Sequence, residues 1–80
     1  GSNTWSASKT FTITPTTISG IAYYEYFVSD TTIPPAENSE IKNFTGNSII
    51  INEPGLYIYL RGINNAGVRG DWARYDLYVN

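Results

Sequence analysis

The sequence predicts an all-β domain in which two antiparallel sheets of about seven short strands pack as a sandwich. Apolar and polar residues alternate in several runs, most clearly in Lys9–Thr14 and Leu56–Ile63. Period-two alternation is the pattern of a strand with one buried and one solvated face. Turn residues separate these runs, and no segment has helical periodicity. Apolar residues make up 41% of the 80 residues and aromatic residues 15%, which is enough material for a core.

Two strands are expected in the N-terminal half. The run Lys9–Thr14 should end at Pro15, which has no backbone donor for a sheet. A loop over Thr16–Gly20 then leads to a strand over Ile21–Ser29. Both faces of this second strand carry aromatic residues, and we expect the face without Glu25 to be buried. That face carries Ala22, Tyr24, Tyr26 and Val28.

Four more strands are expected in the C-terminal half, the first of them at a sheet edge. They are Glu40–Phe44, Ser48–Asn52, Leu56–Ile63 and Trp72–Val79. The loop after Ser29 contains Pro34-Pro35, and Asn64–Gly70 should close a hairpin. Taking one phase of each run, the predicted core consists of Phe11, Ile13, Tyr24, Tyr26, Val28, Ile49, Ile51, Leu56, Ile58, Leu60, Ala73, Tyr75, Leu77 and Val79.

The composition and charge of the chain argue against several classes of function. We interpret Gly1-Ser2 as a cloning remnant and residues 3–80 as a single domain. The net charge of −2, without a basic patch, argues against a nucleic-acid partner. No apolar run approaches the roughly 20 residues that cross a bilayer, so no membrane insertion is expected. Cys and His are absent and the seven acidic residues are scattered, so we expect no catalytic residues, no metal site and no cofactor.

Three features carry a resemblance to a known family. Trp5 precedes the first strand, Ser19-Gly20-Ile21 leads into Tyr23-Tyr24-Glu25-Tyr26, and the chain closes with an aromatic-rich hairpin. In this order and spacing, the chain from Trp5 to Val79 resembles the immunoglobulin-like and fibronectin-III-like repeats of bacterial surface proteins. The resemblance implies an immunoglobulin-like β-sandwich. The family often has Asp where Asn64 stands, so an acidic, metal-assisted loop is not implied here.

The outward face of one sheet is the candidate binding site. In such a sandwich the second strand and the last two lie side by side, and aromatic rings on their outward face can stack on sugar rings. The candidate residues are Tyr23, Phe27, Tyr57, Tyr59, Arg61 and Trp72. The alternative interpretation is structural, because cross-strand aromatic pairs stabilise sheets and a neighbouring domain could cover this face.

Two short motifs are interpreted as chance occurrences. Arg69-Gly70-Asp71 is an integrin-type tripeptide, but it abuts a strand instead of forming a loop tip. Asn43-Phe44-Thr45 is a glycosylation sequon, which a bacterial protein would not use in the eukaryotic manner.

The predicted function is that of a non-catalytic structural or adhesive module, a spacer repeat of a larger bacterial surface or secreted protein. The resemblance implies an extracellular or cell-wall-attached location, and neighbouring domains of the same chain as partners. In isolation the domain should be a monomer. A carbohydrate-binding module with a polysaccharide partner, an accessory domain of a polysaccharide-degrading enzyme and a phage tail-fibre module are the alternatives.

Overall fold

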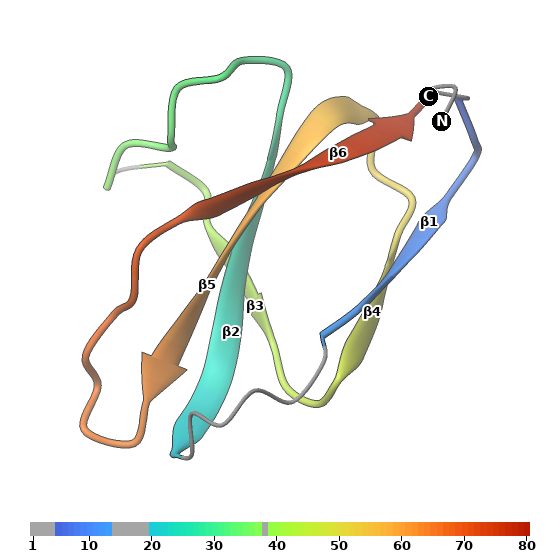
Figure 1. Cartoon of the computed structure of the whole chain (residues 1–80). Coiled ribbons are helices and arrows are strands. Elements are labelled where there is room, and N and C mark those ends of the chain that lie inside the picture. The colour runs from blue at the N-terminus through green and yellow to red at the C-terminus, as the bar shows by residue number, and fades with distance from the viewer. Residues whose placement is uncertain (1–4, 14–19, 38) are drawn as a thin grey trace.

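The computed structural model describes residues 5–13, 20–37 and 39–80 (Figure 1). Over these residues it is all-β, with six strands in two antiparallel sheets. The first sheet has the order β3-β2-β5-β6 and the second pairs β1 with β4. The strands are β1 (Lys9–Thr12), β2 (Ile21–Ser29), β3 (Lys42–Phe44), β4 (Ser48–Ile51), β5 (Gly55–Asn64) and β6 (Ala73–Val79).

The predicted strands are therefore present: β2 has the predicted bounds, β5 is longer by one residue at each end, and β3, β4 and β6 are shorter. A seventh strand is not found in the part of the chain that the structure describes. The predicted strand end at Pro15, most of the loop Thr16–Gly20 and the first two residues lie outside the described residues.

The centre of the larger sheet is the pair β2–β5, and its register confirms the predicted phase of β2. Tyr26 lies opposite Leu60 and Val28 opposite Ile58, so these side chains share the face toward the second sheet. Tyr24 lies on the same face, where its ring stacks on Phe44 of β3 at 5.4 Å. Ala22 is exposed, next to a register irregularity between Ile21 and Tyr23.

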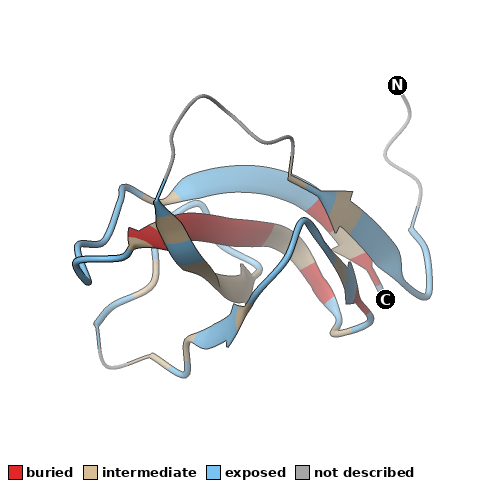
Figure 2. Ribbon diagram, turned by 90° about the horizontal axis from the view of Figure 1, so that it is seen from below, coloured by how far each residue is buried: buried red, intermediate tan, exposed pale blue. Residues whose placement is uncertain are grey.

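The core lies between the two sheets. Its buried members are Ile51, Ile58, Leu60, Leu77 and Val79, and the partly buried residues packed on them are Phe11, Tyr26, Val28, Phe44 and Ile49. Buried residues gather in β5 and at the C-terminal end of β6 (Figure 2). Every one of these ten core residues except Phe44 belongs to the core predicted from the alternation. Each fully buried aliphatic side chain contributes roughly 1.5–3 kcal/mol by leaving water.

Two predicted core positions are wrong. Ala73 is exposed and Tyr75 is 49% exposed, although both lie on the inner phase of β6. The second sheet has only two strands, and its Phe11 ring, 6.4 Å from that of Tyr75, leaves about half of Tyr75 uncovered. Leu56 is only half-buried, because it lies at a β-bulge where Gly55 pairs with Val79 and Tyr57 with Asp76.

The bulge places one extra residue in β6, and Tyr78 there has a φ of 55°. The Tyr78 ring meets Trp5 edge-on at 5.3 Å. On the opposite strand only glycine fits, because a Cβ on Gly55 would overlap the Val28 side chain.

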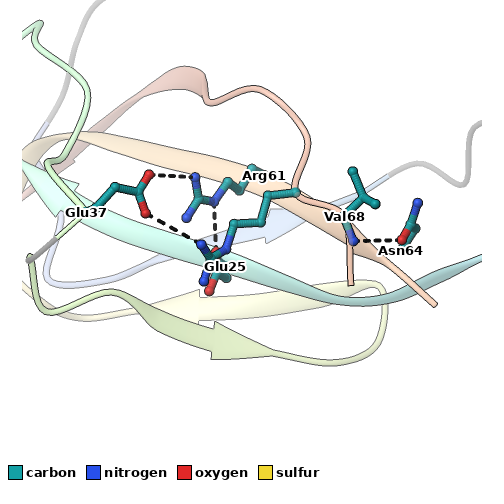
Figure 3. Close-up of polar contacts among 6 residues, drawn as sticks. Glu25, Glu37, Arg61, Asn64 and Val68 are labelled. Carbon is teal, nitrogen blue, oxygen red and sulfur yellow. Dashed lines mark hydrogen bonds and ion pairs between the residues drawn. The ribbon is translucent and has the colours of Figure 1, made fainter. Parts of the chain in front are cut away.

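The hairpin loop between β5 and β6 is stabilised by Asn64. Its Oδ1 accepts hydrogen bonds from the backbone N–H groups of Ala66 and Val68, both at 2.9 Å. Figure 3 shows the bond from Val68. Gly67 follows with a φ of 83°, which L side chains rarely adopt. The neutral amide of Asn64 thus holds the loop by accepting two backbone hydrogen bonds.

Candidate functional site

The structure brings the predicted candidate residues to the outer face of the four-stranded sheet, the face turned away from β1 and β4. Phe27 lies directly opposite Tyr59, and Glu25 opposite Arg61. Tyr23 and Tyr57 continue the same face along β2 and β5, and Trp72 lies just before β6. These positions therefore share one face of the sheet, and their role in binding stays a prediction.

The predicted exposure of this face is wrong at its centre. The loop of residues 30–41 between β2 and β3 contacts it at three points. The Tyr59 hydroxyl donates to the carbonyl of Thr31 at 2.9 Å, and the Leu56 N–H donates to Asp30 Oδ1 at 3.1 Å. The third contact is an ion pair between the carboxylate of Glu37 and the guanidinium of Arg61. Tyr59 is consequently only 2% exposed and Arg61 only 7%.

Under this loop lies a network of four charged side chains. Arg61 Nε donates to Glu25 Oε1 at 2.8 Å, and Arg61 Nη1 lies 3.7 Å from Glu37 (Figure 3). Arg69 lies 3.6 Å from each of the same two carboxylates. Two negative and two positive charges cancel here, so the network carries no net charge. The Glu25 side chain is only 12% exposed, which makes the Glu25–Arg61 pair nearly buried.

Trp72 completes the network from the β6 side. The Arg61 guanidinium lies 4.1 Å from the centre of the Trp72 ring, a cation–π contact. The ring of Tyr59 meets Trp72 edge-on at 6.5 Å. Arg61 Nη2 is buried and has no hydrogen-bond partner among the described residues, so stacking on the ring is its main compensation. The side chains of Arg61 and Trp72 are thus engaged inside the domain.

The remaining candidates are half-buried. Tyr23, Phe27 and Tyr57 retain part of their surface, and Arg74 lies 5.2 Å from the Tyr57 ring. A flat platform across the whole face is not available to a sugar, because Tyr59 at its centre is covered. Binding of a carbohydrate at the other candidate residues stays a prediction.

Each of the two short motifs lies on or beside a strand of the larger sheet. Arg69 pairs with Ile63 in an isolated bridge, and the Gly70 N–H donates to the Gly62 carbonyl at 2.8 Å. The tripeptide therefore runs against the end of β5, and its arginine belongs to the charged network. Asn43 is exposed on β3.

Sequence reasoning missed a hollow on the inner face of the larger sheet. Its volume is about 210 Å³, and it lies beside Ile13, where the chain leaves β1. Its lining residues are Ile13, Tyr24, Leu60, Arg61, Gly62, Asp71, Ala73 and Tyr75. The small residues at 62 and 73 leave space between two tyrosines, and this spacing of small and aromatic residues on adjacent strands was the available signal.

No arrangement for metal chemistry is found in the described ranges, where no three His, Cys, Asp or Glu side chains gather closely enough to hold an ion. Nor do these ranges contain a helix of the length and hydropathy needed to span a membrane. Comparison with protein-family models, with curated proteins and with solved structures finds no match to this chain.

Proposed function

We propose that this chain is a non-catalytic structural module, an immunoglobulin-like spacer domain of a larger extracellular bacterial protein. Its work is mechanical: the domain holds its neighbours apart and resists pulling forces. The resemblance of the sequence to bacterial surface repeats suggests the location and the neighbouring domains.

The observation that supports this role is a backbone clamp between the two ends of the chain. Ser6 forms a parallel bridge with Val79 at the end of β6. The Ser6 N–H donates to the Tyr78 carbonyl and the Asn80 N–H donates to the Ser6 carbonyl, both at 3.0 Å. Lys9 Nζ adds a bond to the carbonyl of Asp76 at 3.2 Å.

The geometry of the clamp allows it to resist a force that pulls the two ends apart. Parallel strands run in the same direction, so a pull on the N-terminal segment and an opposite pull on the C-terminal strand slide them past each other. The bonds between them must then break together, in shear, and not one after another. In a spacer under tension, these hydrogen bonds between Ser6 and the end of β6 would resist unfolding.

Single-molecule force spectroscopy on linked copies of the domain tests the proposal. Ser6→Pro removes the donor to Tyr78 and should lower the unfolding force. Ser39→Pro is the matched control, because it also removes one backbone bond, from Ser39 to Ala36, but in the 30–41 loop. If both variants unfold at the wild-type force, the clamp does not resist tension and the mechanical role is lost.

A carbohydrate-binding module is the second candidate, favoured by the half-buried rings of Tyr23, Phe27 and Tyr57 on one face. An NMR titration with cell-wall and plant polysaccharide fragments tests it. Shifts confined to these rings and saturating at millimolar ligand, an interaction of about 4 kcal/mol, would establish the sugar site. A flat titration would exclude it for the fragments used.

A further inference from the structure

The hollow on the inner face has the size of one side chain. A volume of about 210 Å³ equals the share of about seven water molecules. Sites for drug-sized ligands typically occupy about 300–1,000 Å³, so this hollow is smaller than a typical site of that kind. Tyr24 on β2 and Tyr75 on β6 line it from two different strands, and Leu60, Gly62 and Ala73 lie between them.

The lining of the hollow contains one acidic and one basic residue, Asp71 and Arg61. Asp71 contributes the carboxylate and forms no ion pair with any residue that the structure describes. Arg61 also borders the hollow, but its guanidinium is bound to Glu25 and stacked on Trp72. Aromatic rings together with an uncompensated carboxylate favour a cation, because ring faces and carboxylate both attract positive charge.

A sugar fits this lining less well. A monosaccharide carries several hydroxyl groups, and each one that is buried without a partner costs free energy. Apart from the Arg61 guanidinium, which is bound to Glu25, the lining side chains offer one carboxylate and two phenol groups for hydrogen bonding. An alkylammonium group needs only the carboxylate for its charge and apolar walls for its stem.

The hollow lies beside an open sheet edge. β6 is an edge strand, and the one residue described as pairing with its free side is Ser6, at Val79. The carbonyl of Asp76 already accepts a hydrogen bond from Lys9 Nζ. Residues 73–75 are exposed, and Ala73 and Tyr75 line the hollow. An extended polypeptide can bind such an edge through main-chain hydrogen bonds, with its side chains entering neighbouring pockets.

We propose that an extended polypeptide segment of a partner pairs with the edge of β6 at Ala73–Tyr75 and places a lysine side chain in the hollow. The ammonium lies at Asp71 and the alkyl stem between Tyr24 and Tyr75. This site goes beyond the spacer role and does not depend on it, since the clamp at Ser6 can fail its force test while the hollow still binds.

A titration of the whole ¹⁵N-labelled chain with a capped Val-Thr-Lys-Thr-Val peptide tests the proposal. The amides of Gly62, Asp71, Ala73 and Tyr75 should shift together, since they surround the hollow. The same peptide with norleucine in place of lysine is the matched control and should bind about tenfold more weakly, because it has the stem without the charge. Shifts that lie elsewhere, or equal affinities for the two peptides, overturn the proposal.

Two variants of the domain separate a specific carboxylate from general charge. Asp71→Asn should weaken peptide binding about fivefold to tenfold. Asp76→Asn changes the net charge equally, but its position opposite Tyr57 lies on the outer face, so affinity should be unchanged. Equal losses in both variants would mean nonspecific attraction and refute the site. Tetramethylammonium that binds as tightly as the peptide would refute the polypeptide partner.

Discussion

Replacement of Arg61 by methionine should destabilise the domain more than any change at its exposed partner Arg69. Arg61→Met keeps a long side chain but leaves the Glu25 carboxylate, only 12% exposed, without its 2.8 Å donor. Breaking a buried ion pair typically costs about 3–5 kcal/mol. Arg69, 3.6 Å from the same oxygen, remains as a second cation, so we expect the lower end, about 3 kcal/mol.

The size of this loss is large for so small a domain. Stabilities of about 0.05–0.15 kcal/mol per residue give roughly 4–12 kcal/mol for a chain of this length. Urea denaturation followed by tryptophan fluorescence measures the free energy of unfolding, and Trp72 reports directly on the network because Arg61 stacks on it.

Arg69→Met is the matched control. Arg69 contacts the same two carboxylates, but its side chain is 55% exposed, so the free energy of unfolding should fall by no more than about 1 kcal/mol. A double-mutant cycle with Glu25→Gln and Arg61→Met should show a coupling of more than about 1 kcal/mol. Equal losses for the two arginine variants, with no coupling to Glu25, would refute the claim that the outer face is a buried, stabilising layer.

Three further predictions concern the core, the hairpin loop and the surface. Leu60→Ala should lower the free energy of unfolding by roughly 2–5 kcal/mol because it opens a cavity between the sheets, whereas Lys42→Ala on the edge strand should leave the melting temperature nearly unchanged; similar melting temperatures for the two would contradict the core assignment. Asn64→Ala should cost about 1–3 kcal/mol through the loss of two hydrogen bonds in the hairpin loop, and Asn64→Asp, which keeps the acceptor, should restore most of it; a neutral Asn64→Ala in thermal unfolding would argue against this role. The hydrogen bond from Lys42 to Glu53 raises the pKa of the lysine above 10.5, so the pair stabilises the folded state below that pH and this contribution is lost as the pH rises through the folded pKa. In an NMR pH titration Glu53→Gln should lower the Lys42 pKa, and an unchanged pKa would exclude the pair as its cause.

The alternation of the sequence determined the strands, their faces and the hairpin. Ile58 and Leu60 are buried on the predicted face because a period of two leaves only one phase for the apolar residues of β5. The turn at Asn64 was visible because asparagine and glycine are the residues that satisfy a tight backbone turn. Such local information is present in any window of a few residues.

What covers each face was decided only by the tertiary structure. The alternation predicts that Glu25 points outward into solvent; the phase is right, but the carboxylate is nearly buried, because Arg61 and Arg69 lie against it and supply the opposite charge. On the inner face, Tyr75 has the phase of a core residue but is 49% exposed, since the Phe11 ring of the two-stranded sheet covers only part of it. Alternation states which way a side chain points. Its burial depends on which distant segment packs above it, and that contact is made between residues far apart in the chain.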